Sequence, residues 1–152
     1  MVMNYWLMKT EPDEFSIDDL KRKKVEPWSG VRNYQARNYM RDGMRKGDGV
    51  LFYHSSCDVP GVAGIAEVAT EAHPDPTQFD PKSDYYDKAS TRDAPRWLLV
   101  DVKYKRKLKR VITLAELKQH EELGEMILLR PGNRLSVMPV TKAEWDFVLG
   151  LE

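Results

Sequence analysis

The first third of the chain shows an apolar run followed by apolar residues at helical spacing. Residues 5–9 are aromatic and apolar, and an acidic segment with a proline at 11–13 ends the run, which predicts a strand. Ser16 and Asp19 then form a capping-box pattern ahead of two apolar positions. This pattern predicts a short helix over 17–23.

The next stretch predicts a loop and then a second helix. Pro27 restricts the preceding residue to extended backbone, so Trp28 is expected on a loop. Asn33 predicts the N-cap of a helix over 34–42, whose apolar side can face the core. Basic residues recur every four positions on another side of this stretch, at Arg37, Arg41 and Arg45.

The remainder of the chain predicts further strands and two more capped helices. Strands are expected where turn residues bound apolar runs, at 50–54, 62–68, 97–104 and 134–138. The capping pairs are Thr113 with Glu116, ahead of a helix to about residue 119, and Thr141 with Glu144, ahead of the closing helix. The run over 62–68 has unusually small side chains, which leaves space for another element to lie close.

These elements predict a mixed fold with one long loop. The strands are irregularly spaced and interrupted by helices, so the regular alternation of a parallel α/β sheet is absent. We expect an α/β (α+β mixed) pseudo-barrel of about five to six strands with peripheral short helices, in a single domain over residues 1–152. Residues 73–95 are rich in proline and aspartate, and a loop of that length is usually functional or disordered.

Composition narrows the setting of the protein. Cys57 is the only cysteine, so no intramolecular disulfide can form, which fits a reducing cytoplasm. The chain starts without a secretory signal pattern, and no apolar segment reaches the roughly 20 residues that span a bilayer. We therefore expect a cytoplasmic protein without a membrane partner. The oligomeric state is not readable, with a monomer favoured.

Charge is balanced overall but unevenly distributed. The formal net charge is zero, which argues against a protein that coats nucleic acid by bulk charge. Residues 21–24, 32–46 and 103–110 are nevertheless rich in lysine and arginine, whereas 75–93 is mostly acidic. Local basic patches can therefore contact phosphates, although solvated surface is the simpler explanation of any single cluster.

The stretch from Trp28 to Asn38 has the chemistry of a pocket for a flat ring. Trp28 stands beside Ser29 and Gly30, and a segment with arginines at helical spacing follows. An aromatic plate beside small hydrogen-bonding groups and a positive surface suits a base on a phosphate-bearing chain. Taken by itself, Trp28 is better explained as a half-buried core tryptophan than as a ligand contact.

The sequence resembles the EVE domain, a member of the PUA-like group of small barrels that also contains the YTH readers of methylated adenine. The segments that carry the resemblance run in order through the chain, at 5–12, 28–38, 47–55, 60–68, 95–102 and 134–137. It implies binding of DNA or RNA that carries a modified base, such as 5-methylcytosine or 5-hydroxymethylcytosine. The base would be flipped into an aromatic pocket without catalysis and without a cofactor or metal.

The resemblance also implies a set of contact residues. In YTH readers the base lies beside a lysine on the first strand and a tryptophan followed by a small residue, which Lys9-Thr10 and Trp28-Ser29 match here. Their second cage aromatic falls in the long loop, where this chain has Tyr85-Tyr86 and no tryptophan. The complete expected ligand-binding set is Lys9, Thr10, Trp28, Ser29, Asn33, Tyr34, Ser55, Tyr85, Tyr86, Arg134 and Ser136. The expected contacts to the nucleic-acid backbone are Arg32, Arg37, Arg41 and Arg45.

Two other classes of function remain open. A base and nucleophiles lie close in sequence at His54, Ser55, Cys57 and Asp58, but no third orienting group is evident. A small amidohydrolase acting on a modified nucleoside, another branch of the PUA-like group, would use Lys9, Thr10 and Glu67. A protein-interaction module would instead use the long loop with Tyr85-Tyr86.

Overall fold

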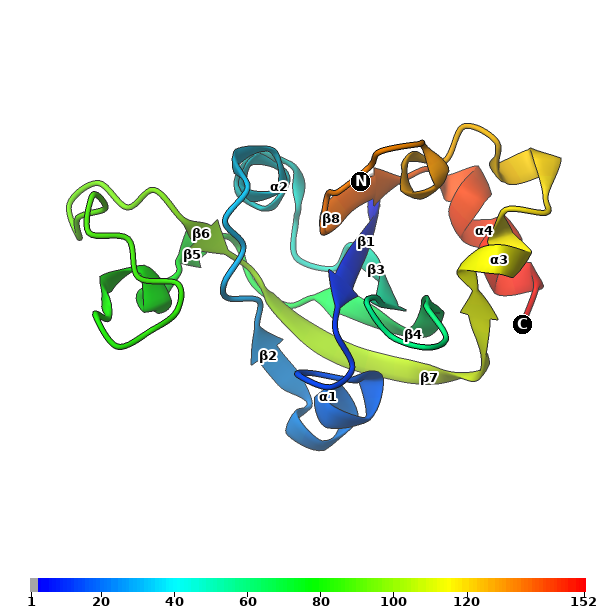
Figure 1. Ribbon diagram of the computed structural model, residues 1–152, viewed down its shortest axis with the longest axis horizontal. Helices are drawn as coiled ribbons and strands as arrows, with labels where there is room; N and C mark the ends of the chain where they lie inside the picture. Colours follow the sequence, from blue (N-terminus) through cyan, green and yellow to red (C-terminus); the bar gives the residue numbers. More distant parts are fainter. Residues whose placement is uncertain (1–2) are drawn as a thin grey trace.

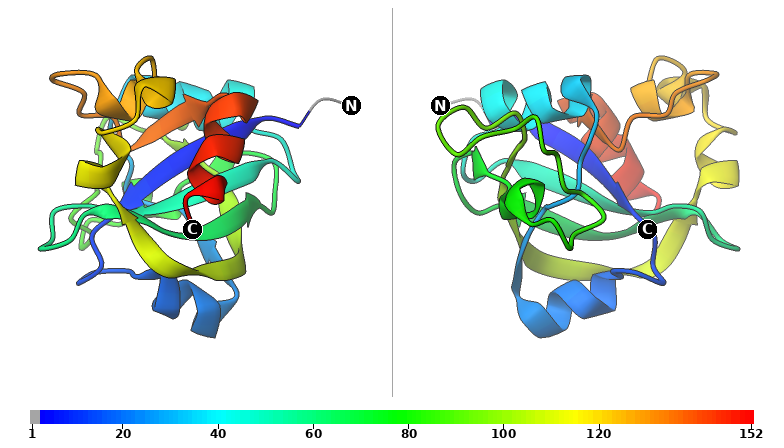
Figure 2. Two further views of the ribbon diagram at one scale, coloured as in Figure 1. Left: turned by 90° about the vertical axis from the view of Figure 1, so that its right-hand side faces the viewer. Right: turned by 60° about the vertical axis from the view of Figure 1, so that its left-hand side comes forward.

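The computed structural model describes residues 3–152, and its centre is a mixed six-stranded sheet (Figure 1). The strand order is β2-β7-β4-β3-β1-β8, in which β1 and β3 are parallel and all other neighbours are antiparallel. The strands are β1 (Tyr5–Thr10), β2 (Val25–Pro27), β3 (Gly49–His54), β4 (Gly61–Val68), β7 (Asp101–Thr113) and β8 (Val137–Val140). The sheet curls into a half-barrel, which confirms the expected fold class (Figure 2).

Short helices surround the sheet, and side-chain caps begin several of them. They are α1 (Ile17–Lys23), α2 (Tyr34–Asn38) with the π-helix η1 (Tyr39–Gly43), α3 (Leu114–Leu117) and α4 (Lys142–Gly150), with 3-10 turns η2 (Pro76–Phe79), η3 (Glu121–Leu123) and η4 (Ile127–Leu129). Ser16 forms the expected capping box with Asp19, and Thr141 forms one with Glu144. The predicted helix starts are therefore confirmed at both ends of the chain.

The sheet buries apolar side chains on both of its faces. Successive residues of β1 point to opposite sides, so Trp6 and Met8 join one core cluster and Leu7 joins the other. The first cluster also holds α1 and α2 residues together with Trp28, whereas the second packs against α3 and α4. Burial on both faces explains why the central strands are apolar at nearly every position.

The structure corrects three of the predicted boundaries. The strand expected over 97–104 is two strands, a short β6 (Leu98–Leu99) paired with β5 (His73–Pro74) and then the long β7. The strand expected over 134–138 begins only at Val137, and β2 was not predicted at all. The helix expected over 34–42 changes to a π-helix after Asn38, so the four-residue spacing of its arginines no longer forms a straight row.

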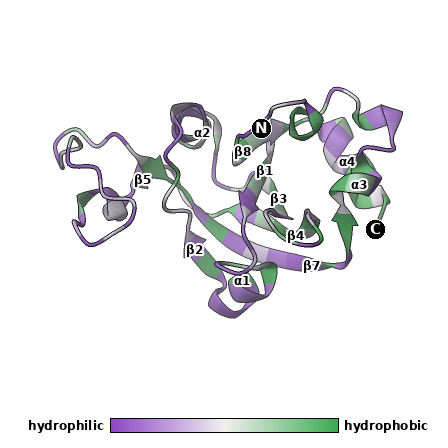
Figure 3. Ribbon diagram, viewed as in Figure 1, coloured by the Kyte–Doolittle hydropathy of each residue, from purple (hydrophilic) through white to green (hydrophobic). Residues whose placement is uncertain are grey.

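The basic side chains within β7 pair with acidic side chains from other parts of the fold. The middle of β7 is strongly hydrophilic (Figure 3). The ion pairs join Lys103 to Glu67 at 2.9 Å, Arg106 to Glu152 at 2.7 Å, Lys107 to Asp18 at 3.0 Å and Arg110 to Glu116 at 2.7 Å. This run is therefore a largely neutralised surface.

The small residues of β4 admit close neighbours, as the sequence predicts. A Cβ at Gly64 would lie 2.4 Å from Cδ1 of Ile17, so α1 packs directly on the strand backbone. A Cβ at Gly61 would lie 2.3 Å from the carbonyl oxygen of Ile112 in β7. The backbone of a neighbouring strand cannot move aside as a flexible side chain can.

Gly61→Ala is therefore expected to lower the free energy of unfolding by about 1–3 kcal/mol, the usual cost of overpacking. Gly150→Ala is the matched control, because a Cβ at Gly150 meets nothing within 4 Å and its backbone has no positive φ. Urea unfolding of both variants measures the difference. Equal stability of the two would show that β4 and β7 separate without cost.

The long loop is an ordered structure at one end of the molecule (Figure 1). The buried side chain of Gln78 donates to the carbonyls of Asp75 and Trp97, at 2.7 Å each, and accepts from the N–H of Trp97 at 3.1 Å. Ser90 donates to the same side-chain oxygen of Gln78. Gln78 thus joins the two ends of the loop. Within residues 3–152, no helix has the length and hydrophobicity needed to cross a membrane.

Candidate nucleic-acid binding site

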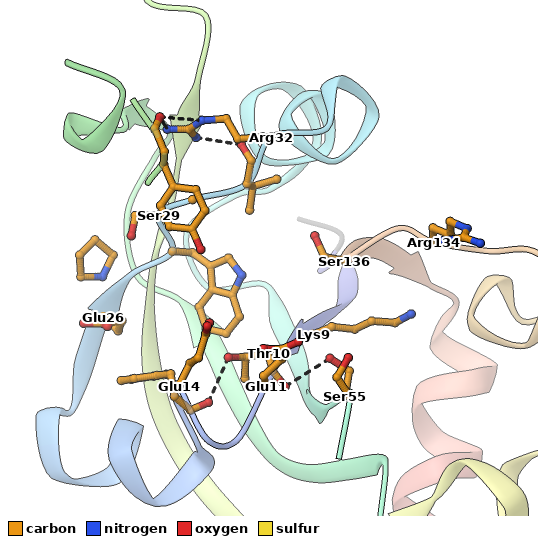
Figure 4. Close-up of a pocket in the computed structure, with 17 residues that line it drawn as sticks. Lys9, Thr10, Glu11, Glu14, Glu26, Ser29, Arg32, Ser55, Arg134 and Ser136 are labelled. Carbon is orange, nitrogen blue, oxygen red and sulfur yellow. Dashed lines mark hydrogen bonds between the residues drawn. The ribbon is translucent and has the colours of Figure 1, made fainter. Parts of the chain in front are cut away.

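A cavity of about 570 Å³ opens where the end of β1 meets β2, the long loop and the segment before β8 (Figure 4). Its volume lies within the range of small-molecule sites. Most of the expected ligand-binding residues line it: Lys9, Thr10, Trp28, Ser29, Ser55, Tyr85, Arg134 and Ser136. Expected residues from five separate segments of the chain therefore line one cavity.

Trp28 is both a core residue and a wall of the cavity. Its side chain is 7% exposed and stands edge-on to Phe52, with ring centroids 5.6 Å apart. The N–H of Trp28 donates to the carbonyl of Val100 at 3.0 Å, which fixes the loop to the strand region. Within residues 3–152 the indole N–H has no protein acceptor and is not fully buried, so it is available to a ligand. Packing in the core and lining the cavity are therefore compatible for Trp28.

Tyr85 supplies a second aromatic ring to the cavity. Gly30 has a φ of +86°, and a Cβ there would lie 2.7 Å from Cε2 of Tyr85. Only glycine combines this backbone with this close contact. Arg32 donates to the carbonyl of Tyr85 at 2.6 and 3.1 Å, and its guanidinium lies 5.5 Å from the centre of the Tyr85 ring.

Asp75 fastens the long loop to the Trp28 segment. Its buried carboxylate accepts from the N–H of Gly30 at 2.8 Å, from Arg32 at 3.2 Å, and from the N–H and hydroxyl of Thr77 at 2.8 and 2.6 Å. Burial alone would raise the pKa of Asp75, but the bonds from Thr77, Gly30 and Arg32 outweigh it and hold the pKa below its usual value. Asp75 was not among the residues predicted from the sequence, although Asp-Pro-Thr is a recognisable turn and cap signal.

Polar and charged groups of both signs surround the aromatic rings. Thr10 donates its hydroxyl to the carbonyl of Phe15 at 3.0 Å, and burial lowers the pKa of Lys9. Three carboxylates that were not predicted from the sequence also line the cavity: Glu11, Glu14 and Glu26. In Figure 4, Glu14 and Glu26 lie on the side of α1 and β2, opposite Arg134 and Ser136. The cavity thus offers donors and acceptors on different sides.

Three expected ligand-binding residues lie outside the cavity lining. Asn33 caps α2 by accepting from the N–H of Ala36 at 3.0 Å. Tyr34 stacks on Trp97, and Tyr86 is exposed on the long loop.

Of the four expected backbone-binding arginines, Arg32 lines the cavity and pairs with Asp75. Arg41 pairs with Asp42 at 2.8 Å, and Arg45 donates to nearby carbonyls. Arg37 donates to the carbonyl of Arg96.

The residue sets suggested for catalysis are not assembled as proposed. His54 accepts from the N–H of Ile17 at 3.1 Å, and burial lowers its pKa, so this nitrogen is occupied at the start of α1. Glu67 lies on β4 and is paired with Lys103 and Lys105, outside the cavity that contains Lys9 and Thr10. The described residues also contain no cluster of histidine, cysteine and carboxylate groups suited to a metal ion.

Comparison with known proteins assigns the family. The family model of the EVE domain matches residues 4–151. The chain belongs to the EVE domain family. This EVE domain is 45% identical to human thymocyte nuclear protein 1 over 168 residues, which cover 98% of this chain and 74% of the human protein.

Solved structures give the same result. A protein from Pseudomonas putida is 51% identical to this EVE domain, with a TM-score of 0.94 and coverage of 97% and 98% of the two chains. Human thymocyte nuclear protein 1 has been crystallised in complex with DNA that contains 5-methylcytosine. That chain is 44% identical in sequence to this EVE domain, with a TM-score of 0.92 and coverage of 97% of this chain and 96% of the human chain. The fold of this EVE domain is accordingly the PUA-like fold.

Proposed function

We propose that this protein binds DNA carrying a modified base, such as 5-methylcytosine or 5-hydroxymethylcytosine, and takes the flipped base into the cavity beside Trp28 without altering it. The observation that carries the proposal is the pair of aromatic residues, Trp28 and Tyr85, in one polar cavity. Its support is the similarity along nearly the whole chain to a human protein solved with 5-methylcytosine DNA.

The cavity matches the chemistry that a flipped base requires. Stacking on an aromatic ring contributes about 1–3 kcal/mol per base. The base edge needs donors and acceptors, which Ser29 and the free indole N–H of Trp28 supply from one side and Lys9 from another. The backbone would be held by Arg32, Arg37, Arg41 and Arg45, of which Arg37 and Arg45 lack an acidic partner within 4 Å in residues 3–152.

Selectivity for the modification requires more than burial of a methyl group. One buried methyl contributes about 0.8 kcal/mol, which is roughly a fourfold preference. A larger preference therefore depends on the shape of the cavity or on displacement of a bound water.

The test is binding of matched oligonucleotides that differ only in one cytosine. The protein is titrated at two salt concentrations with duplex and single-stranded DNA and RNA, each carrying cytosine, 5-methylcytosine or 5-hydroxymethylcytosine. The mass of the recovered oligonucleotide is then measured by mass spectrometry. We expect tighter binding of modified DNA, weaker binding at high salt and an unchanged ligand. Equal affinity for modified and unmodified strands would contradict the proposal, and tighter binding of RNA would change the partner.

A small amidohydrolase remains the alternative from another class, because Lys9 and Thr10 share the cavity with the carboxylates of Glu11, Glu14 and Glu26. The same mass measurement separates the two functions. A ligand recovered with an altered mass would make the protein an enzyme.

A further inference from the structure

An exposed aromatic ring stands outside the cavity on a layered stack that begins at the cavity wall. The stack runs from Tyr85 through the guanidinium of Arg32 to Trp97 and then to Tyr34, with successive spacings of 5.5, 5.2 and 4.7 Å. Trp97 is buried, whereas Tyr34 is 50% exposed. Tyr34 is therefore the outer layer of this stack.

The ring of Tyr34 is held rigidly from behind. It is nearly parallel to the Trp97 indole, with an interplanar angle of 19°. The indole N–H of Trp97 donates to Asp87 at 2.8 Å, and the backbone around Trp97 is fixed by Gln78. An exposed ring fixed in this way loses little conformational entropy when a second flat group stacks on it.

The exposed ring of Tyr34 lies next to the positive charge of Arg37. The Arg37 guanidinium is 4.7 Å from the centre of Tyr34 and 6.0 Å from that of Trp97, so it lies beside the stacked pair. If Arg37 covered the face of Tyr34 that points away from Trp97, its distance to Trp97 would be much longer than its distance to Tyr34. Arg37 is oriented by the carbonyl of Arg96 and by Asn38, and within residues 3–152 no carboxylate lies within 4 Å of it.

We propose that Tyr34 and Arg37 form a second subsite, in which the open face of Tyr34 stacks on the base of a nucleotide flanking the flipped one and Arg37 binds its phosphate. This inference rests on the proposed function for the position of the strand. Exposed aromatic rings beside arginines are the usual platforms for unpaired bases.

The geometry connects the two subsites along one strand. The spacings of 5.5, 5.2 and 4.7 Å keep the ring centres of Tyr85 and Tyr34 within half a helical turn of DNA, which is roughly 17 Å. A strand whose flipped base lies in the cavity therefore reaches Tyr34 within a few nucleotides. Tyr34 would contribute affinity and local strand preference, and the cavity would contribute preference for the modification.

The experiment removes one base at a time from the DNA and measures whether the resulting loss of affinity depends on Tyr34. DNA with one 5-methylcytosine, or with cytosine at that position, carries a stable abasic site at each flanking position in turn. Binding is measured for the parent protein, Tyr34→Ala, Tyr34→Phe and Arg37→Gln. Tyr34→Phe is the matched control because it keeps the stacking ring, and circular dichroism checks that the variants are folded.

We expect the parent protein to lose roughly 5- to 150-fold in affinity at one abasic position, the range for one stacked base. The Tyr34→Ala variant should bind intact DNA more weakly than the parent protein by the same factor. An abasic site at that position should not weaken its binding further, and its preference for 5-methylcytosine should equal that of the parent protein. Tyr34→Phe should behave as the parent, and Arg37→Gln should show a smaller dependence on salt.

The outcomes for the two proposals are separate. If the protein prefers 5-methylcytosine but the effect of every abasic site is the same with and without Tyr34, only the second subsite is overturned. The exposed ring would then be a candidate contact for a protein partner. Coupling without methyl preference supports the subsite and overturns the proposed function. If the parent protein binds none of these strands, both are overturned.

Discussion

Trp28→Ala is expected to abolish the preference for DNA carrying 5-methylcytosine and to weaken its binding roughly 5- to 150-fold, because one stacked base contributes about 1–3 kcal/mol. The same substitution removes a 7% exposed side chain from the core and its edge-on contact with Phe52. Large aromatic residues cost about 3–5 kcal/mol of stability when truncated in this way. Fluorescence titration at a temperature well below the melting point separates the two effects.

Two further variants keep this prediction testable. Trp28→Phe retains a ring, so it should bind with intermediate affinity and keep most of the stability. Trp145→Ala removes another tryptophan, which belongs to α4, packs against Tyr5 with ring centroids 4.6 Å apart and does not line the cavity. It should lower stability and leave affinity unchanged. If Trp145→Ala weakens binding as much as Trp28→Ala does, the loss reflects stability and Trp28 is not the stacking surface.

The sequence predicts local structure well where the signal is local. The capping boxes at Ser16 and Thr141 place two helix starts, because the side chain that begins each helix and its partner are three residues apart. The small side chains of β4 also predict a close neighbour, because a run of small residues leaves space beside the strand. The extent of β7 could not be predicted, because Glu67 and Glu152, which compensate its basic residues, are distant in sequence and meet them only in the folded sheet.

The candidate site divides in the same way. Trp28, Ser29, Lys9 and Thr10 are predicted from the family resemblance, whereas Asp75 has its effect through Gly30 and Arg32, which are more than 40 residues away. Glu14 and Glu26 carry no signal at all, since exposed glutamates are common on any surface. Tyr34 was selected from the correct stretch, but the stacking of its ring on Trp97 depends on the long loop.

Asp75→Ala is expected to lower the free energy of unfolding by about 3 kcal/mol. The lower end of the cost of breaking a buried ion pair applies, because Arg32 keeps some contact with water. The substitution leaves the N–H groups of Gly30 and Thr77 without their acceptor and releases the loop that holds Tyr85. Urea unfolding at pH 7 measures the loss, and affinity for modified DNA should fall with it because Tyr85 lines the cavity.

Acid should remove the same contribution from the parent protein. Because the pKa of Asp75 is lower in the folded state than the ordinary value of about 3.9, the unfolded state binds the proton first. Its stabilising contribution is therefore fully present above that ordinary value and is lost as the pH falls through the folded pKa. Asp75→Asn should show a shallower loss of stability below about pH 4 than the parent protein does.

The control for this acid dependence is an exposed aspartate of the same loop. Asp84→Asn should retain the stability of the parent protein at pH 7 and its loss at low pH, because Asp84 is exposed and Asp75 is intact. Other carboxylates titrate in the same range, so only the difference between a variant and its parent isolates Asp75. Identical acid profiles for Asp75→Asn and the parent would mean that Asp75 does not fasten the loop, and the wall formed by Tyr85 would then need another cause.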